Sequence, residues 1–196
     1  MKYISTRGQT APMDFSDVLL MGLAPDGGLM LPEHYPNIDS RTLDEWRTLS
    51  YPQLAMAIMQ RFATDIPAAD LQDIIERTYT SEVFGSDEIV PVRKLEDNLY
   101  ILGLSNGPTL AFKDVAMQFL GNAFEYVLKR KNARITIIGA TSGDTGSAAE
   151  YALRGKDNIE VFMLSPHGKM SEFQRAQMYS LTDDNIHNIA IDGMFD

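Results

Sequence analysis

The chain has 196 residues, of which 44% are hydrophobic and 22% are charged, a balance that is typical of globular proteins and too apolar for a disordered one. Its formal net charge of −10 disfavours nucleic acid and anionic membrane surfaces as partners, because both carry negative charge themselves. The absence of cysteine excludes disulfides, thiolate nucleophiles and cysteine-bound zinc, and together with the lack of a signal peptide or membrane-length apolar stretch it favours a cytoplasmic location.

The first 85 residues carry a helical pattern that proline and glycine interrupt. Apolar side chains recur at helical spacing from Leu54 to Phe62 and from Leu71 to Ile75. An earlier apolar segment, residues 15–23, ends at a turn that contains Pro25 and two glycines. These patterns predict a small helical domain over residues 1–85, in which the apolar stripes form core. Three polar side chains are candidate helix caps: Ser40, Thr64 and Asp65.

From about residue 88 the pattern changes to apolar runs of strand length that alternate with amphipathic helical stretches. Strands are predicted at 99–104, 134–139, 159–164 and 186–191, and helices at 114–130, 145–154 and 171–181. This alternation indicates right-handed crossovers and a parallel sheet, so residues 86–196 are predicted to form an α/β domain. Ligands of such sheets bind at the carboxyl ends of strands, which directs attention to the loops after residues 104, 139 and 164.

The first of these loops ends in Lys113, at the start of a predicted helix. Cations normally lie at the other end of a helix, because the N-terminus carries partial positive charge. Lys113 follows Leu110, Ala111 and Phe112, so we expect it to face a dry apolar pocket. Desolvation and the helix dipole would favour the neutral amine there, as a Schiff-base lysine requires. The alternative is an ordinary solvated lysine.

The second loop, residues 139–147, has the sequence GATSGDTGS. Its glycines match neither the dinucleotide-binding pattern nor the P-loop. It offers backbone N–H groups, hydroxyls and a helix N-terminus, a combination that suits a small anion such as a carboxylate or phosphate. The alternative is a tight strand-to-helix turn in which Thr141 or Ser142 caps the helix.

The third loop, residues 165–171, adds His167 and Lys169 at the same edge of the predicted sheet. The three histidines of the chain do not fall at ligand spacing, so no metal site is predicted. No nucleophile elbow or Ser/His/Asp set is recognised either.

Together these loops resemble the threonine synthases, a pyridoxal-phosphate-dependent family with the tryptophan-synthase-β-like fold (fold type II). The resemblance runs from end to end, and the block around Lys113 together with the block at 141–149 makes it specific. One difference is Asn106, where members of the family often have histidine. The landmarks in chain order are YISTRG at 3–8, GLAPDGGL at 22–29, PE at 32–33, GPTLAFKD at 107–114, TSGDTGSAA at 141–149, Gly168 and Lys169, Gln174, and Gln177 with Met178.

The resemblance implies a three-layer α/β catalytic domain and conversion of O-phosphohomoserine and water to threonine and phosphate. It implies that Lys113 holds pyridoxal 5'-phosphate as a Schiff base and then shuttles protons, and that Asp144 lies near the cofactor's 3-oxygen. It also implies cationic groups for the substrate phosphate, for which Arg7, Lys169 and Arg175 are the candidates and Lys169 the preferred one. The substrate α-carboxylate is expected to bind Thr141, Ser142, Gly143 and Thr145.

Two alternatives stay open: another pyridoxal-phosphate lyase such as a threonine dehydratase, and a non-catalytic anion-binding module. The 139–147 loop is the one glycine-rich strand-to-helix loop of the sequence, and it is already assigned to the substrate. We therefore expect the 196 residues to be an N-terminal fragment that is inactive alone, in which residues 86–196 are the first part of the catalytic domain. Such a fragment is expected to self-associate through the sheet that it leaves uncovered.

Overall fold

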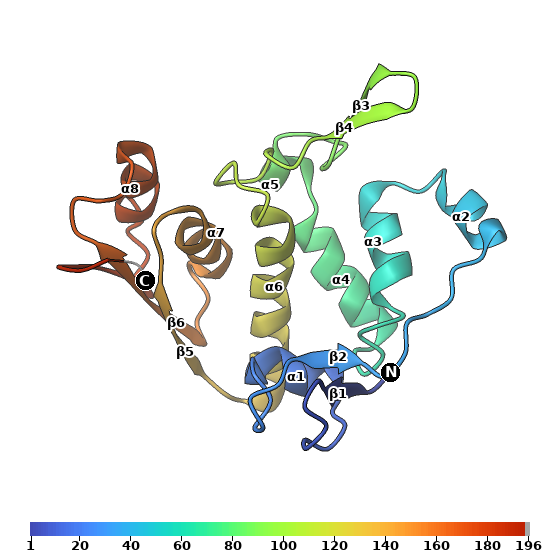
Figure 1. The fold of residues 1–196 in the computed structure, drawn as a ribbon, viewed down its shortest axis with the longest axis horizontal. Helices are drawn as coiled ribbons and strands as arrows, with labels where there is room; N and C mark the ends of the chain where they lie inside the picture. Colours follow the sequence, from blue (N-terminus) through green and yellow to red (C-terminus); the bar gives the residue numbers. More distant parts are fainter. Residues whose placement is uncertain (195–196) are drawn as a thin grey trace. The chain divides into compact units, whose positions relative to one another are not determined.

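The structure is a computed structural model that describes residues 1–194 (Figure 1). Contacts divide the chain into two compact units, Met1–Arg77 and Thr78–Asp196. The domain boundary predicted between residues 85 and 86 stays a prediction, because compactness alone does not define a domain. Among the described residues, no helix is both long and apolar enough to cross a membrane.

The first unit contains helices, as predicted, together with a small antiparallel ribbon. The ribbon pairs β1 (Tyr3–Ser5) with β2 (Met30–Pro32). Each strand has three residues, which is too short for an alternating apolar pattern to show in the sequence. The helices are α1 (Phe15–Met21), α2 (Ser40–Trp46), α3 (Tyr51–Met59) and α4 (Ala68–Thr78).

The helix caps differ from those predicted. Asp39, not Ser40, caps α2, because its carboxylate accepts a hydrogen bond from the Thr42 N–H at 2.8 Å. Thr64 and Asp65 begin no helix: α4 starts at Ala68, after a proline, and the Asp65 carboxylate accepts a hydrogen bond from the Ser16 N–H. The stripe from Leu71 to Ile75 is buried as core, in agreement with the prediction, whereas Leu54, Ile58 and Phe62 stay partly exposed.

The second unit contains the predicted parallel sheet. Its strands are β5 (Ile135–Ala140), β6 (Ile159–Pro166) and β7 (Ile186–Ile191), in the order β5-β6-β7. They alternate with α6 (Asp114–Lys131), α7 (Asp144–Leu153) and α8 (Glu172–Tyr179), so the predicted α/β class is confirmed. The unit also contains the short α5 (Ser81–Phe84).

The strand predicted at 99–104 is present, but its place in the parallel sheet was wrong. It forms β4 (Leu99–Leu102), which pairs antiparallel with β3 (Val92–Glu96) in a separate hairpin. The reversal lies between the two strands, where Asn98 adopts a left-handed backbone with φ of 64°. β4 therefore pairs with β3 in this hairpin and not with β5.

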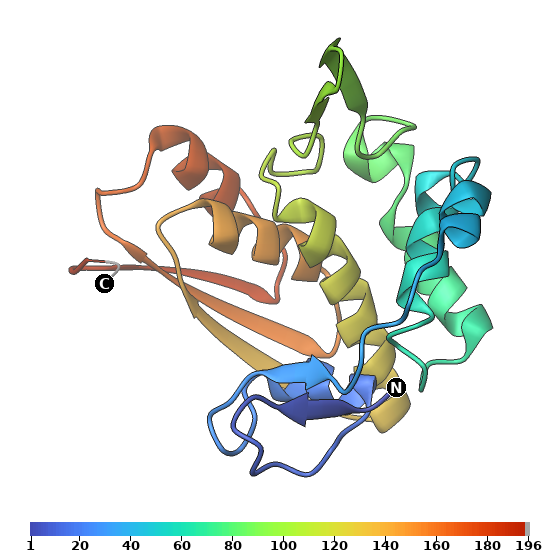
Figure 2. The same cartoon turned by 45° about the vertical axis from the view of Figure 1, so that its right-hand side comes forward.

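The two faces of the parallel sheet differ in the described part of the chain. Ile159 and Val161 of β6 point to the buried face, on which α7 lies (Figure 2). On the opposite face Ile138 is 72% exposed, and Phe162 stacks on His187 with ring centroids 4.5 Å apart. Residues 1–194 thus cover one face of the sheet and leave apolar side chains on the other.

Candidate functional site

The lysine loop, residues 105–113, folds back on the first residue of α6. The fully buried Asp114 carboxylate accepts hydrogen bonds from the Thr109 hydroxyl and the Thr109 N–H, both at 2.8 Å. Burial raises the pKa of Asp114, and the two hydrogen bonds from Thr109 oppose that rise. Gly107 permits this close approach, since a Cβ there would lie 2.3 Å from the Asp114 Cβ. The loop is therefore held rigidly next to Lys113.

Lys113 itself directly precedes α6 and is half-buried. Its Nζ lies 4.5 Å from the centroid of the Phe112 ring, and within residues 1–194 it has no hydrogen-bond or ion-pair partner. The enclosed apolar pocket expected around it is not formed by its neighbours, because Leu110 and Phe112 are 57% and 62% exposed. Ala111 and Asp114 take the inward positions of this turn, which leaves Leu110 and Phe112 on its outer side.

The glycine loop, residues 139–147, connects β5 to α7 and is shaped by Thr141. The buried Thr141 hydroxyl accepts hydrogen bonds from the N–H groups of Gly143 at 3.1 Å and Gly146 at 3.0 Å. Thr141 thus caps the strand-to-helix turn, in agreement with one of the two interpretations of this loop that the sequence left open. Ser142 and Thr145 are exposed, and their side chains bond no other described residue. These two hydroxyls are the ones available to a ligand.

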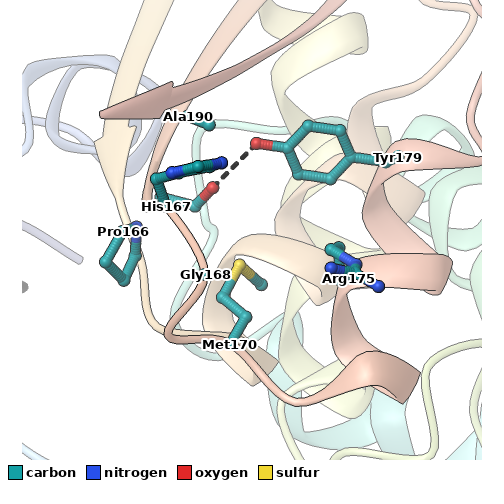
Figure 3. A pocket seen from close by; sticks show the side chains of 8 residues that line it. Pro166, His167, Gly168, Met170, Arg175, Tyr179 and Ala190 are labelled. Carbon is teal, nitrogen blue, oxygen red and sulfur yellow. Dashed lines mark hydrogen bonds between the residues drawn. The ribbon is translucent and has the colours of Figure 1, made fainter. Parts of the chain in front are cut away.

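Lys169 of the third loop is not among the residues that line the cavity at the end of β6. Its exposed Nζ donates to the Gly193 carbonyl oxygen at 3.0 Å. Arg7 belongs to the first unit, where its guanidinium donates to the Asp26 carbonyl oxygen at 2.9 Å. Of the three cations expected to bind phosphate, Arg175 is the one that lines the neighbouring cavity (Figure 3).

This cavity has a volume of about 160 Å³ and lies at the carboxyl end of β6. The Ser165 and Tyr179 hydroxyls are hydrogen-bonded to each other at 2.9 Å on its wall. His167 and Arg175 supply its nitrogen atoms, and Figure 3 shows Met170 between the loop and α8. The lining residues are Ser165, Pro166, His167, Gly168, Met170, Arg175, Tyr179 and Ala190.

Two glutamines of α8 connect the loops, a role that the sequence analysis did not assign. The Gln174 amide donates to the Asp144 carboxylate at 2.6 Å. The Gln177 amide donates to the Thr109 carbonyl oxygen at 3.1 Å and accepts from the Ser147 hydroxyl at 3.1 Å. Both glutamines belong to the motifs on which the resemblance rests. They are three residues apart, and this spacing indicates that they share a face of a helix.

The sequence of this chain is similar to those of known threonine synthases. Residues 2–79 match the family described as "Threonine synthase N terminus". A threonine synthase of Methylobacillus glycogenes is 59% identical over the whole chain, and one of Corynebacterium glutamicum is 56% identical. The chain spans 43% and 42% of the length of these two relatives.

Solved structures agree with this similarity in fold. The crystal structure of a threonine synthase from Brucella melitensis, whose title describes it as bound to PLP, superposes on 100% of the chain with a TM-score of 0.94 and 45% identity. The yeast threonine synthase superposes on 99% of it with a TM-score of 0.93, also at 45% identity. The chain covers 42% and 41% of these structures. Over its whole length, the chain is therefore similar in sequence and in fold to about two fifths of the length of these threonine synthases.

Proposed function

We propose that the full-length protein carrying this chain is a threonine synthase, a pyridoxal-phosphate-dependent lyase that converts O-phosphohomoserine and water to threonine and phosphate. One observation carries the proposal, namely that α8 joins two loops with complementary groups. The lysine loop ends in an amine that has no partner among the described residues, and the glycine loop carries two exposed hydroxyls. The identity to threonine synthases over the whole chain supports it.

The donor set of this unit fits the cofactor at Lys113 and Asp144. An amine without a competing ion pair suits a covalent bond to pyridoxal phosphate, and Asp144 is held by Gln174 at the start of α7. When bound, the cofactor withdraws electrons from the α-carbon of the substrate, which makes removal of its α- and β-protons feasible. The Lys113 amine is the group that would accept and return these protons.

The glycine loop is assigned to the α-carboxylate of the substrate. Ser142 and Thr145 would donate their hydroxyls, while Gly143 and the Thr141 cap maintain the turn that presents them. The substrate phosphate is assigned to the third loop. Lys169 and Arg175 remain the candidates there, and Arg175 lines the cavity at the end of β6.

Replacing Ser142 by alanine is expected to weaken substrate binding selectively. A lost charge-assisted hydrogen bond is worth roughly 1.5–3 kcal/mol, which corresponds to a KM for O-phosphohomoserine about 10 to 150 times higher. The absorption spectrum of the bound cofactor should not change, because Ser142 is assigned to the substrate and not to the cofactor. Ser81→Ala, at an exposed serine of α5, is the control. An unchanged KM in Ser142→Ala would remove the glycine loop from the substrate site.

The function is tested by incubating the full-length, cofactor-loaded protein with O-phosphohomoserine and, separately, with threonine. Threonine and phosphate released in equal amounts from O-phosphohomoserine are the expected result. Formation of 2-oxobutanoate from threonine would instead identify a threonine dehydratase. A protein that acts on neither and takes up no cofactor would be an anion-binding module.

We also propose a cytoplasmic location for the protein and self-association of the 196 residues when they are produced alone. The sequence lacks cysteine, which supports a cytoplasmic location. The apolar face of the sheet that carries Ile138 supports self-association of the 196 residues when they are produced alone. Analytical ultracentrifugation of that chain over a range of concentrations measures it directly.

A further inference from the structure

We propose that Gln177 is a positioning residue, whose side-chain amide sets the place of Lys113 relative to the glycine loop. This inference rests on the proposed function, in which the Lys113 amine and the glycine loop must act on the same substrate molecule. The juxtaposition itself is a property of the second unit and can be measured without any substrate.

The Gln177 amide joins two groups that are themselves buried. Thr109, whose carbonyl oxygen accepts from Nε2, is 5% exposed, and Ser147, whose hydroxyl donates to Oε1, is fully buried. Thr109 is fixed in turn to the Asp114 carboxylate by two hydrogen bonds of 2.8 Å. A continuous chain of hydrogen bonds therefore leads from the start of α7, through Gln177 and Thr109, to the residue next to Lys113.

The two partners are matched by a side chain at position 177 that carries a donor and an acceptor, as the neutral amide of glutamine does. The Thr109 carbonyl oxygen can only accept, so it needs an N–H donor, and the Ser147 hydroxyl needs an acceptor at the other end of the same side chain. An ionised glutamate has the length of glutamine but lacks the donor, and leucine lacks both groups. The two hydrogen bonds thus distinguish glutamine from residues of similar size.

Gln174 strengthens the same connection one helical turn earlier. Its Nε2 donates to Asp144, and its Oε1 accepts from the Ser171 hydroxyl at 2.8 Å. Gly143 leaves the space for it, because a Cβ at that position would lie 2.3 Å from the Gln174 Cδ. Gln174 is hydrogen-bonded to Asp144 and Gln177 to Ser147, so one face of α8 contacts the first turn of α7 at two points. Of these two glutamines, Gln177 is the one that also contacts the lysine loop.

The experiment compares Gln177→Leu and Gln177→Glu with the wild type in the full-length protein, and uses Gln72→Leu, on the exposed face of α4, as the matched control. Backbone hydrogen exchange is followed in the lysine loop and the glycine loop without substrate. We expect exchange in the lysine loop to become at least about 10-fold faster in both Gln177 variants, with β5 and β6 unchanged. We also expect kcat to fall roughly 10- to 100-fold while KM changes about threefold or less, because a displaced catalytic amine slows chemistry more than binding.

Gln177→Glu provides the readout that a purely structural role would not move. A protonated glutamic acid can donate to the Thr109 carbonyl oxygen and accept from Ser147, whereas the ionised form cannot donate. Protection of the lysine loop, relative to wild type at the same pH, should therefore recover as the pH is lowered. Gln177→Leu should show no such recovery.

Wild-type exchange rates in the lysine loop of both variants would overturn the proposal, as would faster exchange that spreads equally over the whole unit. Faster exchange confined to the lysine loop, in a protein that makes no threonine, would contradict the proposed function and leave the positioning contact intact. If Gln177→Leu fails to fold, the pH dependence of Gln177→Glu decides alone: protection that does not vary with pH refutes the proposal.

Discussion

Replacing Lys113 by alanine in the full-length protein is expected to reduce threonine formation by about 10³-fold or more, because the proposed reaction needs this amine twice. It is the residue proposed to bind the cofactor, and it is the base proposed to carry protons at the substrate. The half-buried amine has no partner in the described part of the chain that its loss would orphan, so the fold should survive. Lys113→Arg keeps the charge but should be equally inactive, because a guanidinium does not form the covalent bond.

Lys94→Ala is the matched control for this loss. Lys94 forms an exposed ion pair with Asp97 at 2.7 Å in the β3–β4 hairpin, and its removal should leave activity unchanged. Borohydride reduction of the loaded wild type, followed by peptide mapping, should place the pyridoxyl group on Lys113. A label on Lys129 or Lys169, or an active Lys113→Ala variant, would show that the lysine is wrongly assigned.

Glu150→Gln is expected to stabilise the protein above neutral pH. Glu150 lies on α7, its side chain is fully buried, and neither carboxyl oxygen makes a hydrogen bond of normal geometry with the described residues. Burial raises the pKa of Glu150 from 4.5 to about 7, and the nearby Asn188 side chain lowers it by less. The unfolded chain therefore loses this proton at a lower pH than the folded protein does.

The sign of the pH dependence follows from that difference. Between pH 4.5 and about 7 the folded state holds a proton that the unfolded state has released, so the free energy of unfolding falls as the pH rises. The loss is complete above about pH 7 and is on the order of 3 kcal/mol. Glutamine carries no charge at any pH, so Glu150→Gln should remove this loss and match the wild type near pH 4.

Urea unfolding at about pH 5 and about pH 8 measures the effect as a difference between variant and wild type. Glu96→Gln, at an exposed position of β3, is the control and should shift neither midpoint. A Glu150→Gln variant that loses stability equally at both values would mean that the buried carboxyl is stabilising in its charged form.

Much of the second unit was predictable because its strands are long apolar runs. The segments that became β5 and β7 are rich in β-branched residues, β6 is a mainly apolar run, and helices with apolar faces separate the three. The partner of β4 was not predictable in the same way. Arg93 and Lys94 interrupt the apolar character of β3, so the first half of the hairpin carried no strand signal. Because β4 precedes α6 and β5 in the chain, it was predicted to join β5 through a crossover, which the structure does not have among its described residues.

The candidate site was also predictable only in part. Lys113 and the glycine loop were recognisable because each follows a local rule or departs from one, such as a cation at a helix start. What local rules could not show is which hydroxyl is used internally: Thr141 is consumed by its own turn, whereas Ser142 is left free. Contacts such as that of Gln177 with Thr109 join residues 68 positions apart, and no local pattern in the sequence encodes them.

That separation also sets the order in which the site can form during synthesis. The lysine loop and the glycine loop leave the ribosome well before α8, since Gln177 follows Thr109 by 68 residues and Ser147 by 30. At elongation rates of roughly 5–20 residues per second, the glycine loop waits about 2 to 6 seconds and the lysine loop about 3 to 14 seconds for the helix that links them. During that interval β5 and β6 can pair, whereas β7 is synthesised only after α8. Translation therefore supplies both loops and two strands of the parallel sheet before the helix that links the loops, and the third strand after it.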